Sequence, residues 1–312
     1  MKTAPLLKRW REAFFRTPLP DVAIQITSRF LCGVRIHPAE RKAGAHFILP
    51  LPAGVLRPSF DKPNLIRPEV LEELIREGTR RLGLESGKAA LLLPESSARV
   101  VILPLPSWPR SLKERDRIVR WRTAKLMPLL PEDAHLVYQR YPRSSSGKVV
   151  VLAARRSVVA EYEDLADRLR FRSNMVTLPS LTLVNLLKNN ADPDVLLIDV
   201  EEDALSLAAV IDRDISLFRQ KPYGTERQSG ESSGPDRDAI LQDVENTLHF
   251  IEDREKRRIP AARLRLGLLD GGNGMAEALH NGLSIPVVPA EEWIPVVSGP
   301  ADILAAVAGL TS

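Results

Sequence analysis

The chain has 312 residues, more than a single domain usually holds, so its length predicts two domains or one bilobed domain. A hydrophobic content of 44% is enough for a sizeable core, and the net charge of +4 is spread along the chain, which gives no reason to expect a nucleic-acid partner. Cys32 is the only cysteine, which excludes an intrachain disulfide, and no stretch approaches the ~20 apolar residues that span a bilayer. We therefore expect a soluble, cytoplasmic protein.

Residues 1–20 differ in composition from the rest of the chain. Apolar side chains recur there at helical spacing, with basic residues between them, and two prolines end the pattern. This predicts an amphipathic N-terminal helix or tail with an apolar stripe of Leu6, Leu7, Trp10 and Phe14. Three interpretations stay open: the helix packs on the protein's own core, contacts a membrane surface weakly, or binds a partner.

The next segment, residues 21–190, alternates strands and helices. Turn residues and period-two apolar patterns predict strands within 22–51 and at 89–93, 100–104, 137–141 and 149–154. Helical spacing predicts helices over 63–84, 112–127, 157–170 and 178–187.

The last segment, residues 191–312, repeats part of this arrangement. A strand-turn-strand at 195–218 matches the one at 22–36, and helices are predicted over 238–254 and 300–310. A strand, a glycine-rich turn and a helix follow one another over 266–279. Two matching strand-turn-strand units indicate a duplicated architecture with a cleft between its halves.

Four local patterns, in this order and spacing, carry a resemblance to a known family. They are Leu-Pro-Glu-Ser-Ser at 93–97 with Val-Val-Ile-Leu-Pro-Leu-Pro at 100–106, Ile-Val-Arg-Trp-Arg at 118–122 with Met-Pro-Leu-Leu-Pro-Glu-Asp at 127–133, Val-Val-Val-Leu-Ala-Ala-Arg-Arg-Ser-Val-Val at 149–159, and Leu-Leu-Ile-Asp-Val at 196–200. After residue 20, the chain resembles the type IV pilus assembly protein PilM family, whose fold is shared by the cytoplasmic domain of the type II secretion protein GspL.

The resemblance implies the fold and its division. We expect an α/β protein with the actin-like ATPase (ribonuclease H-like) fold, a duplicated two-lobe fold with an inserted small α/β subdomain in the first lobe. The first lobe would span residues 21–190, with the inserted subdomain at about 91–169, and the second lobe would span 191–312.

The resemblance also implies a nucleotide site between the lobes, and the residues here depart from it. The family's first turn reads roughly Asp-Ile-Gly-Ser, where the Asp faces the magnesium ion. At the matching positions this chain has Gln25, Ile26, Thr27 and Ser28, so an amide replaces the carboxylate and a β-branched residue replaces the glycine.

The second turn keeps its aspartate as Asp199, but Glu201 stands at the glycine position and two more acidic residues follow it. Like charges would repel a phosphate there, so we favour a solvated acidic hairpin tip. The third turn, on the adenosine side, keeps its glycines as Gly271, Gly272 and Gly274.

No arrangement of side chains indicates a catalytic residue or a metal site, because the histidines are scattered and there is no second thiol. The sequence therefore predicts a degenerate nucleotide site and no cofactor. Binding of ATP with magnesium is the alternative.

In the family, a groove in the first lobe binds the N-terminal tail of an inner-membrane partner, PilN. For this chain the resemblance implies a PilN-like partner, and the inserted subdomain is the expected region. The candidate partner-binding residues are Trp108, Trp121, Leu126, Met127 and Leu129.

Two hypotheses of different classes follow. The first is a non-catalytic scaffold, a pseudo-ATPase at the cytoplasmic face of the inner membrane, which acts by binding its partner. The second is a slow ATPase of the same assembly, in which a carboxylate such as Asp199 replaces the missing metal ligand, or a GspL-like secretion component.

Overall fold

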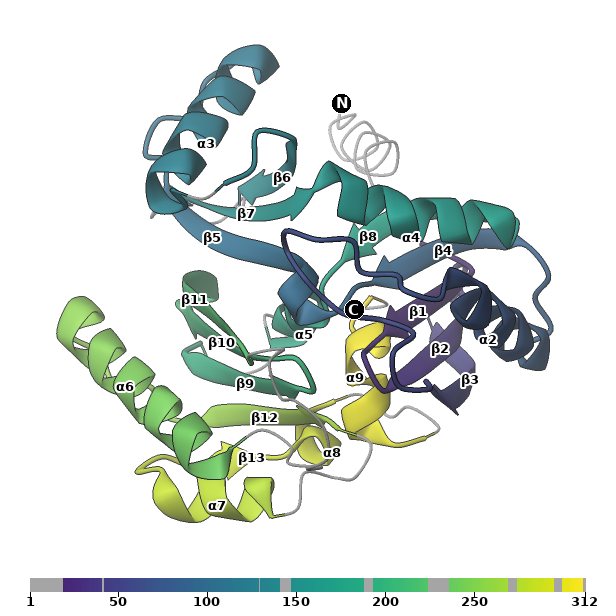
Figure 1. Ribbon diagram of the computed structural model, residues 1–312. Coiled ribbons are helices and arrows are strands. Elements are labelled where there is room, and N and C mark those ends of the chain that lie inside the picture. The colour runs from purple at the N-terminus through teal and green to yellow at the C-terminus, as the bar shows by residue number, and fades with distance from the viewer. Residues whose placement is uncertain are drawn as a thin grey trace, which may run out of the picture.

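The computed structural model describes residues 19–40, 42–128, 130–140, 147–187, 193–223, 236–268, 274–294 and 299–310. Two five-stranded sheets form its framework (Figure 1). The first has the order β3-β2-β1-β4-β8 and the second β11-β10-β9-β12-β13. The strands of the first sheet are β1 (Val22–Ile26), β2 (Phe30–His37), β3 (Lys42–Pro50), β4 (Gly87–Leu92) and β8 (Phe171–Thr177). Those of the second are β9 (Val195–Glu201), β10 (Ala204–Ile211), β11 (Asp214–Pro222), β12 (Ala262–Gly267) and β13 (Val287–Val288).

The two sheets have the same topology. In each, three antiparallel strands form a meander, and the first strand of the meander then pairs in parallel with the fourth, which pairs in parallel with the fifth. The helices correspond as well, since a helix follows the third, fourth and fifth strand of each sheet. The predicted internal duplication is therefore confirmed.

In the first half these helices are α2 (Pro68–Arg81), α4 (Arg156–Arg168) and α5 (Pro179–Leu187). In the second half they are α6 (Arg237–Glu255), α7 (Met275–Gly282) and α9 (Ala301–Ala308), with the short α8 (Ala290–Trp293) before α9. The helices α5 and α9 pack against each other between the two sheets (Figure 1). In the described part of the chain, no helix is long and apolar enough to cross a membrane.

A third sheet is inserted between β4 and α4. It has the order β5-β7-β6, all antiparallel, and consists of β5 (Ala98–Pro104), β6 (Ala134–Arg140) and β7 (Lys148–Arg155). A short 3₁₀ helix, η1 (Glu95–Ser97), leads into it, and α3 (Leu112–Leu126) packs on β5. This is the predicted subdomain of the first lobe, and it has a small core of its own around Leu103, Val119 and Val151.

The apolar residues form two large cores that share the second sheet. One core joins the first sheet to α5, α9 and one face of the second sheet. The other lies on the opposite face of the second sheet, beneath α6 and α7. The inner face of the second sheet is therefore buried against the first lobe, and any polar residue on that face needs a partner there.

Two predicted details differ from the structure. The helix expected over 63–84 begins only at Pro68, because the backbone N–H groups of Asn64 and Leu65 each donate to Glu161 at 2.8 Å and hold this segment extended. The strand β8 was not predicted, because most of its residues are half-buried and show no clean alternation. The predicted lobe boundaries stay predictions, and residues 1–18 lie outside the described residues.

Candidate functional site

Polar side chains from both lobes meet between the two sheets, and strand periodicity places them there. Alternate apolar residues of β9 pack in the core beneath α6, so Asp199 and Glu201 point to the other face, toward the first lobe. The same alternation in β12 turns Arg265 toward the first lobe. The two strands pair in parallel, with Asp199 beside Arg265 and Glu201 beside Gly267.

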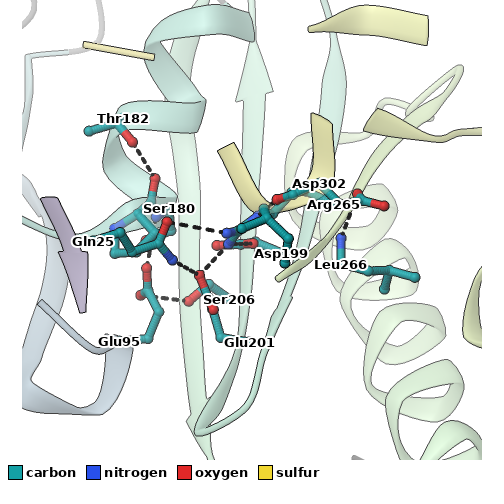
Figure 2. A network of polar contacts seen from close by, with 12 residues as sticks. Gln25, Glu95, Ser180, Thr182, Asp199, Glu201, Ser206, Arg265, Leu266 and Asp302 are labelled. Carbon is teal, nitrogen blue, oxygen red and sulfur yellow. Dashed lines mark hydrogen bonds and ion pairs between the residues drawn. The ribbon is translucent and has the colours of Figure 1, made fainter. Parts of the chain in front are cut away.

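Arg265 is the centre of this group, which we call the cleft cluster: Gln25, Asp199, Glu201 and Arg265 (Figure 2). Its Nη1 donates to Asp199 Oδ1 at 3.0 Å and also to Glu201 Oε1. Its Nη2 donates to Gln25 Oε1 at 3.4 Å, and Gln25 Nε2 donates to Glu201 Oε1 at 2.8 Å. The Nε of Arg265 donates to the backbone oxygen of Asp302 in α9 at 2.6 Å. Arg265 is 0% exposed, so the whole guanidinium is out of contact with solvent.

One guanidinium faces two carboxyl groups in this cluster. Burial raises the pKa of Glu201 well above its ordinary value, although Arg265 acts in the opposite direction, and burial raises the pKa of Asp199 too. Desolvation lowers the pKa of Arg265, but the charges of Glu201 and Asp199 more than offset this and raise it. An uncompensated buried charge is strongly disfavoured, so the single guanidinium is the main source of stability for both carboxyl groups. Asp199 Oδ2 and Glu201 Oε2 have no hydrogen-bond partner within the described residues.

The glycine at the end of β12 allows this close approach. A Cβ on Gly267 would lie 2.5 Å from Glu201 Oε2 and 2.7 Å from Arg265 Nη1. Any larger residue at this position must push the carboxyl and the guanidinium away.

The acidic turn after β9 is not the solvated hairpin tip that the sequence favoured. Glu201 is 1% exposed and binds Arg265, the side chain of Glu202 is 7% exposed and lies 3.5 Å from Arg29, and Asp203 accepts from the backbone N–H of Ser96 at 2.8 Å. The three carboxyl groups point in different directions, and each has a partner from another element. Separate partners remove the repulsion that would otherwise expose the turn.

Outside the cleft cluster, the buried carboxyl group of Glu95 in η1 connects the inserted subdomain to the second lobe. It accepts from the backbone N–H of Ser180 at 2.7 Å, the hydroxyl of Ser206 at 2.9 Å and the amide of Gln220 at 3.0 Å. Burial, with a smaller contribution from the charge of Asp199, raises the pKa of Glu95 to about 7. The seam between the lobes is therefore polar, and hydrogen bonds from both lobes hold Glu95 within it.

The first turn binds several of its own hydrogen-bond donors. The Thr27 hydroxyl accepts from the backbone N–H groups of Arg29 at 3.3 Å and Phe30 at 3.0 Å, and it donates to the Phe30 oxygen at 2.9 Å. Ser28 is half-buried in the same turn. The backbone N–H groups of Thr27, Arg29 and Phe30 are therefore used within the turn. A guanidinium bound to Asp199 and Glu201 occupies the metal-facing side. These residues do not fit a magnesium–phosphate group.

The predicted adenosine turn is described only at its end. Gly274 caps α7 with a φ of +80°, a left-handed conformation that favours glycine. Gly271 and Gly272 lie outside the described residues. Within the described ranges, no group of three or more His, Cys, Asp or Glu side chains could hold a metal ion.

A groove lies on the other side of the first lobe, between the inserted sheet and β8. We call it the edge groove. It encloses about 200 Å³ and is lined by Leu93, Ala98, His135, Val137, Leu152, Ala154, Val159, Glu163 and residues 173–178. Two strand edges border it, because β6 and β8 are each the last strand of their sheet in the described structure. The hydroxyl of Ser173 is buried there without a hydrogen-bond partner within the described residues.

The predicted partner-binding residues lie outside the edge groove. Trp108 is half-buried in a wider hollow on the other face of β6, with its ring 6.2 Å from that of Tyr138. Trp121 and Leu126 are exposed on α3, at 56% and 57%, and Met127 is half-buried just after it. Leu129 lies outside the described residues.

The duplicated sheets, the matching helices and the subdomain inserted in the first lobe define the actin-like ATPase fold. Solved structures agree. A chain of the "PilM-PilN type IV pilus biogenesis complex" matches with a TM-score of 0.76 at 17% identity, covering 94% of this chain and 98% of that one.

A protein from Bacteroides thetaiotaomicron with an actin-like ATPase fold gives 0.57 at 11% identity, with 95% and 97% covered. The cytoplasmic domain of EpsL, an inner membrane component of the type II secretion system of Vibrio cholerae, gives 0.51 at 11% identity, with 93% and 94% covered. The fold expected from the family resemblance is confirmed. No protein-family model and no curated protein matches the sequence.

Sequence reasoning missed Arg265, Glu95 and β8. A signal existed for Arg265, because an arginine inside the apolar strand pattern of Ala262–Gly267 must find a buried partner or face solvent. The sequence does not reveal which partner, since Gln25 is 240 residues away.

Proposed function

We propose that this chain is a PilM-like scaffold of a type IV pilus or a related envelope machine. In this proposal it works at the cytoplasmic face of the inner membrane, binds the N-terminal tail of a PilN-like protein and does not turn over ATP. The likeness to a chain of the PilM-PilN complex, over nearly the full length of both chains, supports the assignment to this kind of assembly. Its TM-score exceeds that of the EpsL cytoplasmic domain, which favours the pilus over the secretion system.

The edge groove is the observation that carries the proposal. An extended peptide can add to a free strand edge through backbone hydrogen bonds, while pockets for alternate side chains give specificity. The strands β6 and β8 offer such edges on either side of the groove, and Val137 and Met175 supply apolar contacts. The unpartnered hydroxyl of Ser173 suits a polar group of the peptide.

Anisotropy of a labelled peptide tests the proposal, the peptide being the N-terminal cytoplasmic tail of the PilN-like protein from the same organism. We expect saturable binding, and we expect Val137→Asp and Met175→Asp each to weaken it at least ~10-fold, or about 1.4 kcal/mol. Ile66→Asp is the matched control, because Ile66 is 49% exposed and does not line the groove. Absence of saturable binding by the intact chain would overturn the proposal.

We propose a second contact for the tail at Trp108, Trp121, Leu126, Met127 and Leu129. Of these, Trp108 lies on the other face of β6, and Trp121 and Leu126 lie on α3. Trp121→Ala and Leu126→Ala separate the two surfaces. If they weaken the peptide as strongly as Val137→Asp does, the tail extends beyond the edge groove; if they have no effect, the tail is confined to it.

The absence of ATP turnover is supported by the guanidinium of the cleft cluster, which binds the two carboxyl groups, and by the Thr27 hydroxyl, which binds backbone N–H groups of the first turn. The N-terminal stripe of Leu6, Leu7, Trp10 and Phe14 is proposed as a weak, salt-sensitive contact with anionic lipid. Co-sedimentation with anionic vesicles, for the full chain and for a variant lacking residues 1–20, tests that contact. Equal, negligible sedimentation of both would remove it.

A further inference from the structure

The cleft cluster lies where the two matching strand-turn-strand units face each other, and it contains its own cation. We propose that Arg265 supplies, from within the chain, the positive charge that a bound metal would otherwise supply at this position, and that it holds the two lobes together without nucleotide. The inference shares with the proposed function only the absence of ATP turnover and does not depend on the edge groove.

The contacts of the guanidinium reach three other elements. Arg265 belongs to β12 and binds two carboxyl groups of β9, the amide of Gln25 in β1 and the backbone of Asp302 in α9. The carboxylate of Asp302 in turn accepts from the backbone N–H of Leu266 at 3.0 Å, which fixes α9 against β12. A single side chain therefore connects the first sheet to the second.

Gln25 is the residue that carries this connection across the cleft. Its amide donates to Glu201 and accepts from Arg265, so it needs both an acceptor and a donor on the opposite lobe. An aspartate at this position could not donate to Glu201, and a second buried carboxylate would face the first. The glutamine is therefore matched to a guanidinium–carboxyl pair and not to a metal ion.

The two buried carboxyl groups of the cluster also need a cation close by, and Arg265 is that cation. Loss of Arg265 would leave Asp199 and Glu201 buried at 0% and 1% exposure with no positive group in contact. Breaking a buried pair in this way is much more damaging than breaking an exposed one. We expect Arg265→Ala to lower the melting temperature by roughly 5–15 °C.

The test uses the full chain and thermal melts of four proteins: wild type, Arg265→Ala, Arg265→Ala with Glu201→Gln, and the control Arg258→Ala, whose side chain is 84% exposed. The control should melt with wild type. The added Glu201→Gln should recover part of the loss in Arg265→Ala, because it removes one of the two stranded carboxyl groups. An Arg265→Ala protein as stable as the control would overturn the inference, as would a double variant less stable than Arg265→Ala.

Two further measurements test the inference. The first uses only wild type, so it remains informative if a variant does not fold. Calorimetric titration of Mg-ATP into wild type should give no saturable heat, and millimolar Mg²⁺ alone should leave its melting temperature unchanged. In Arg265→Ala, by contrast, Mg²⁺ should raise the melting temperature, because the ion can replace the lost charge at the two carboxyl groups. Saturable binding of Mg-ATP to wild type would overturn the inference. Peptide binding, measured on the same samples, would report separately on the proposed function.

Discussion

The cleft cluster and the edge groove both contain polar groups. They differ in the hydrogen-bond and ion-pair partners that those groups have. In the cleft, the charged side chains bind one another, and Arg265 completes the set. In the edge groove, two strand edges and a serine hydroxyl have no partner within the described residues. Charged groups that bind one another stabilise the fold, whereas open strand edges can bind another molecule.

The difference matters because the proposed function depends on the edge groove and not on the cleft. The actin-like fold directs attention to the cleft, where the duplicated turns face each other. The two halves have the same strand topology, but the side chains of their turns form different contacts. One turn is closed by the hydroxyl of Thr27, and the other sends Glu201 to an arginine. The predictions that follow test this contrast, starting with the largest expected effect.

The first prediction concerns pH and Glu95. Its pKa is raised by burial to about 7, above the value of about 4.3 for an unfolded chain, so the folded state binds its proton more tightly. Its contribution to stability is therefore complete below about pH 4.3 and is lost as the pH rises through about 7. The loss is at most about 4 kcal/mol, at about 1.4 kcal/mol for each pKa unit.

Urea unfolding across this pH range, for wild type and Glu95→Gln, isolates the effect, because other buried carboxyl groups contribute equally to both proteins. The stability of wild type should fall more steeply than that of the variant between about pH 5 and pH 8. Parallel curves would show that Glu95 is ionised throughout and that its three donors suffice to keep it so.

The second prediction concerns the close contact at Gly267. Gly267→Ala places a Cβ within 2.5 Å of Glu201 Oε2 and 2.7 Å of Arg265 Nη1, which must separate the ion pair. We expect a loss of about 1–3 kcal/mol in the free energy of unfolding. Gly54→Ala is a suitable control, because nothing lies within 4 Å of a Cβ there, although its φ of +74° carries a strain of its own. If Gly267→Ala destabilises the protein no more than this control, the cluster tolerates rearrangement and its geometry is not restrictive.

The third prediction has the smallest effect. Arg29 lies 3.5 Å from Glu202 across the same cleft, but its side chain is 48% exposed. An ion pair whose cation is exposed to solvent is screened and contributes only about 0–1 kcal/mol. Arg29→Ala should therefore change the free energy of unfolding by that much. A loss comparable to that of Arg265→Ala would mean that the rim of the cleft, and not its buried centre, holds the lobes together.

Much of the fold follows from local pattern. The turn after Ile26, the acidic turn after Glu201 and the helices α2 to α7 and α9 have clear turn or helical signals, and the duplication is visible in the sequence. The short α8 was not predicted. The site was less accessible. Gln25 and Glu201 could be singled out because they depart from the family's turns, and Asp199 because it keeps the aspartate of the second turn.

Arg265 could not be singled out in this way, because its role depends on partners 64 and 240 residues away. The solvated tip was predicted from charge density alone, and burial against Arg265, Arg29 and Ser96 overrides that tendency. The edge groove was missed because β8 has an irregular burial pattern and gives no strand signal.

The most direct test of the account is a calorimetric titration of the PilN-like tail peptide into the intact chain, with and without saturating Mg-ATP. The account predicts saturable peptide binding with the same affinity in both cases, because the groove is open and the cleft is closed by the chain's own arginine. Binding that appears only with Mg-ATP, or that shifts severalfold when Mg-ATP is added, would contradict it, since a coupled nucleotide site must then exist.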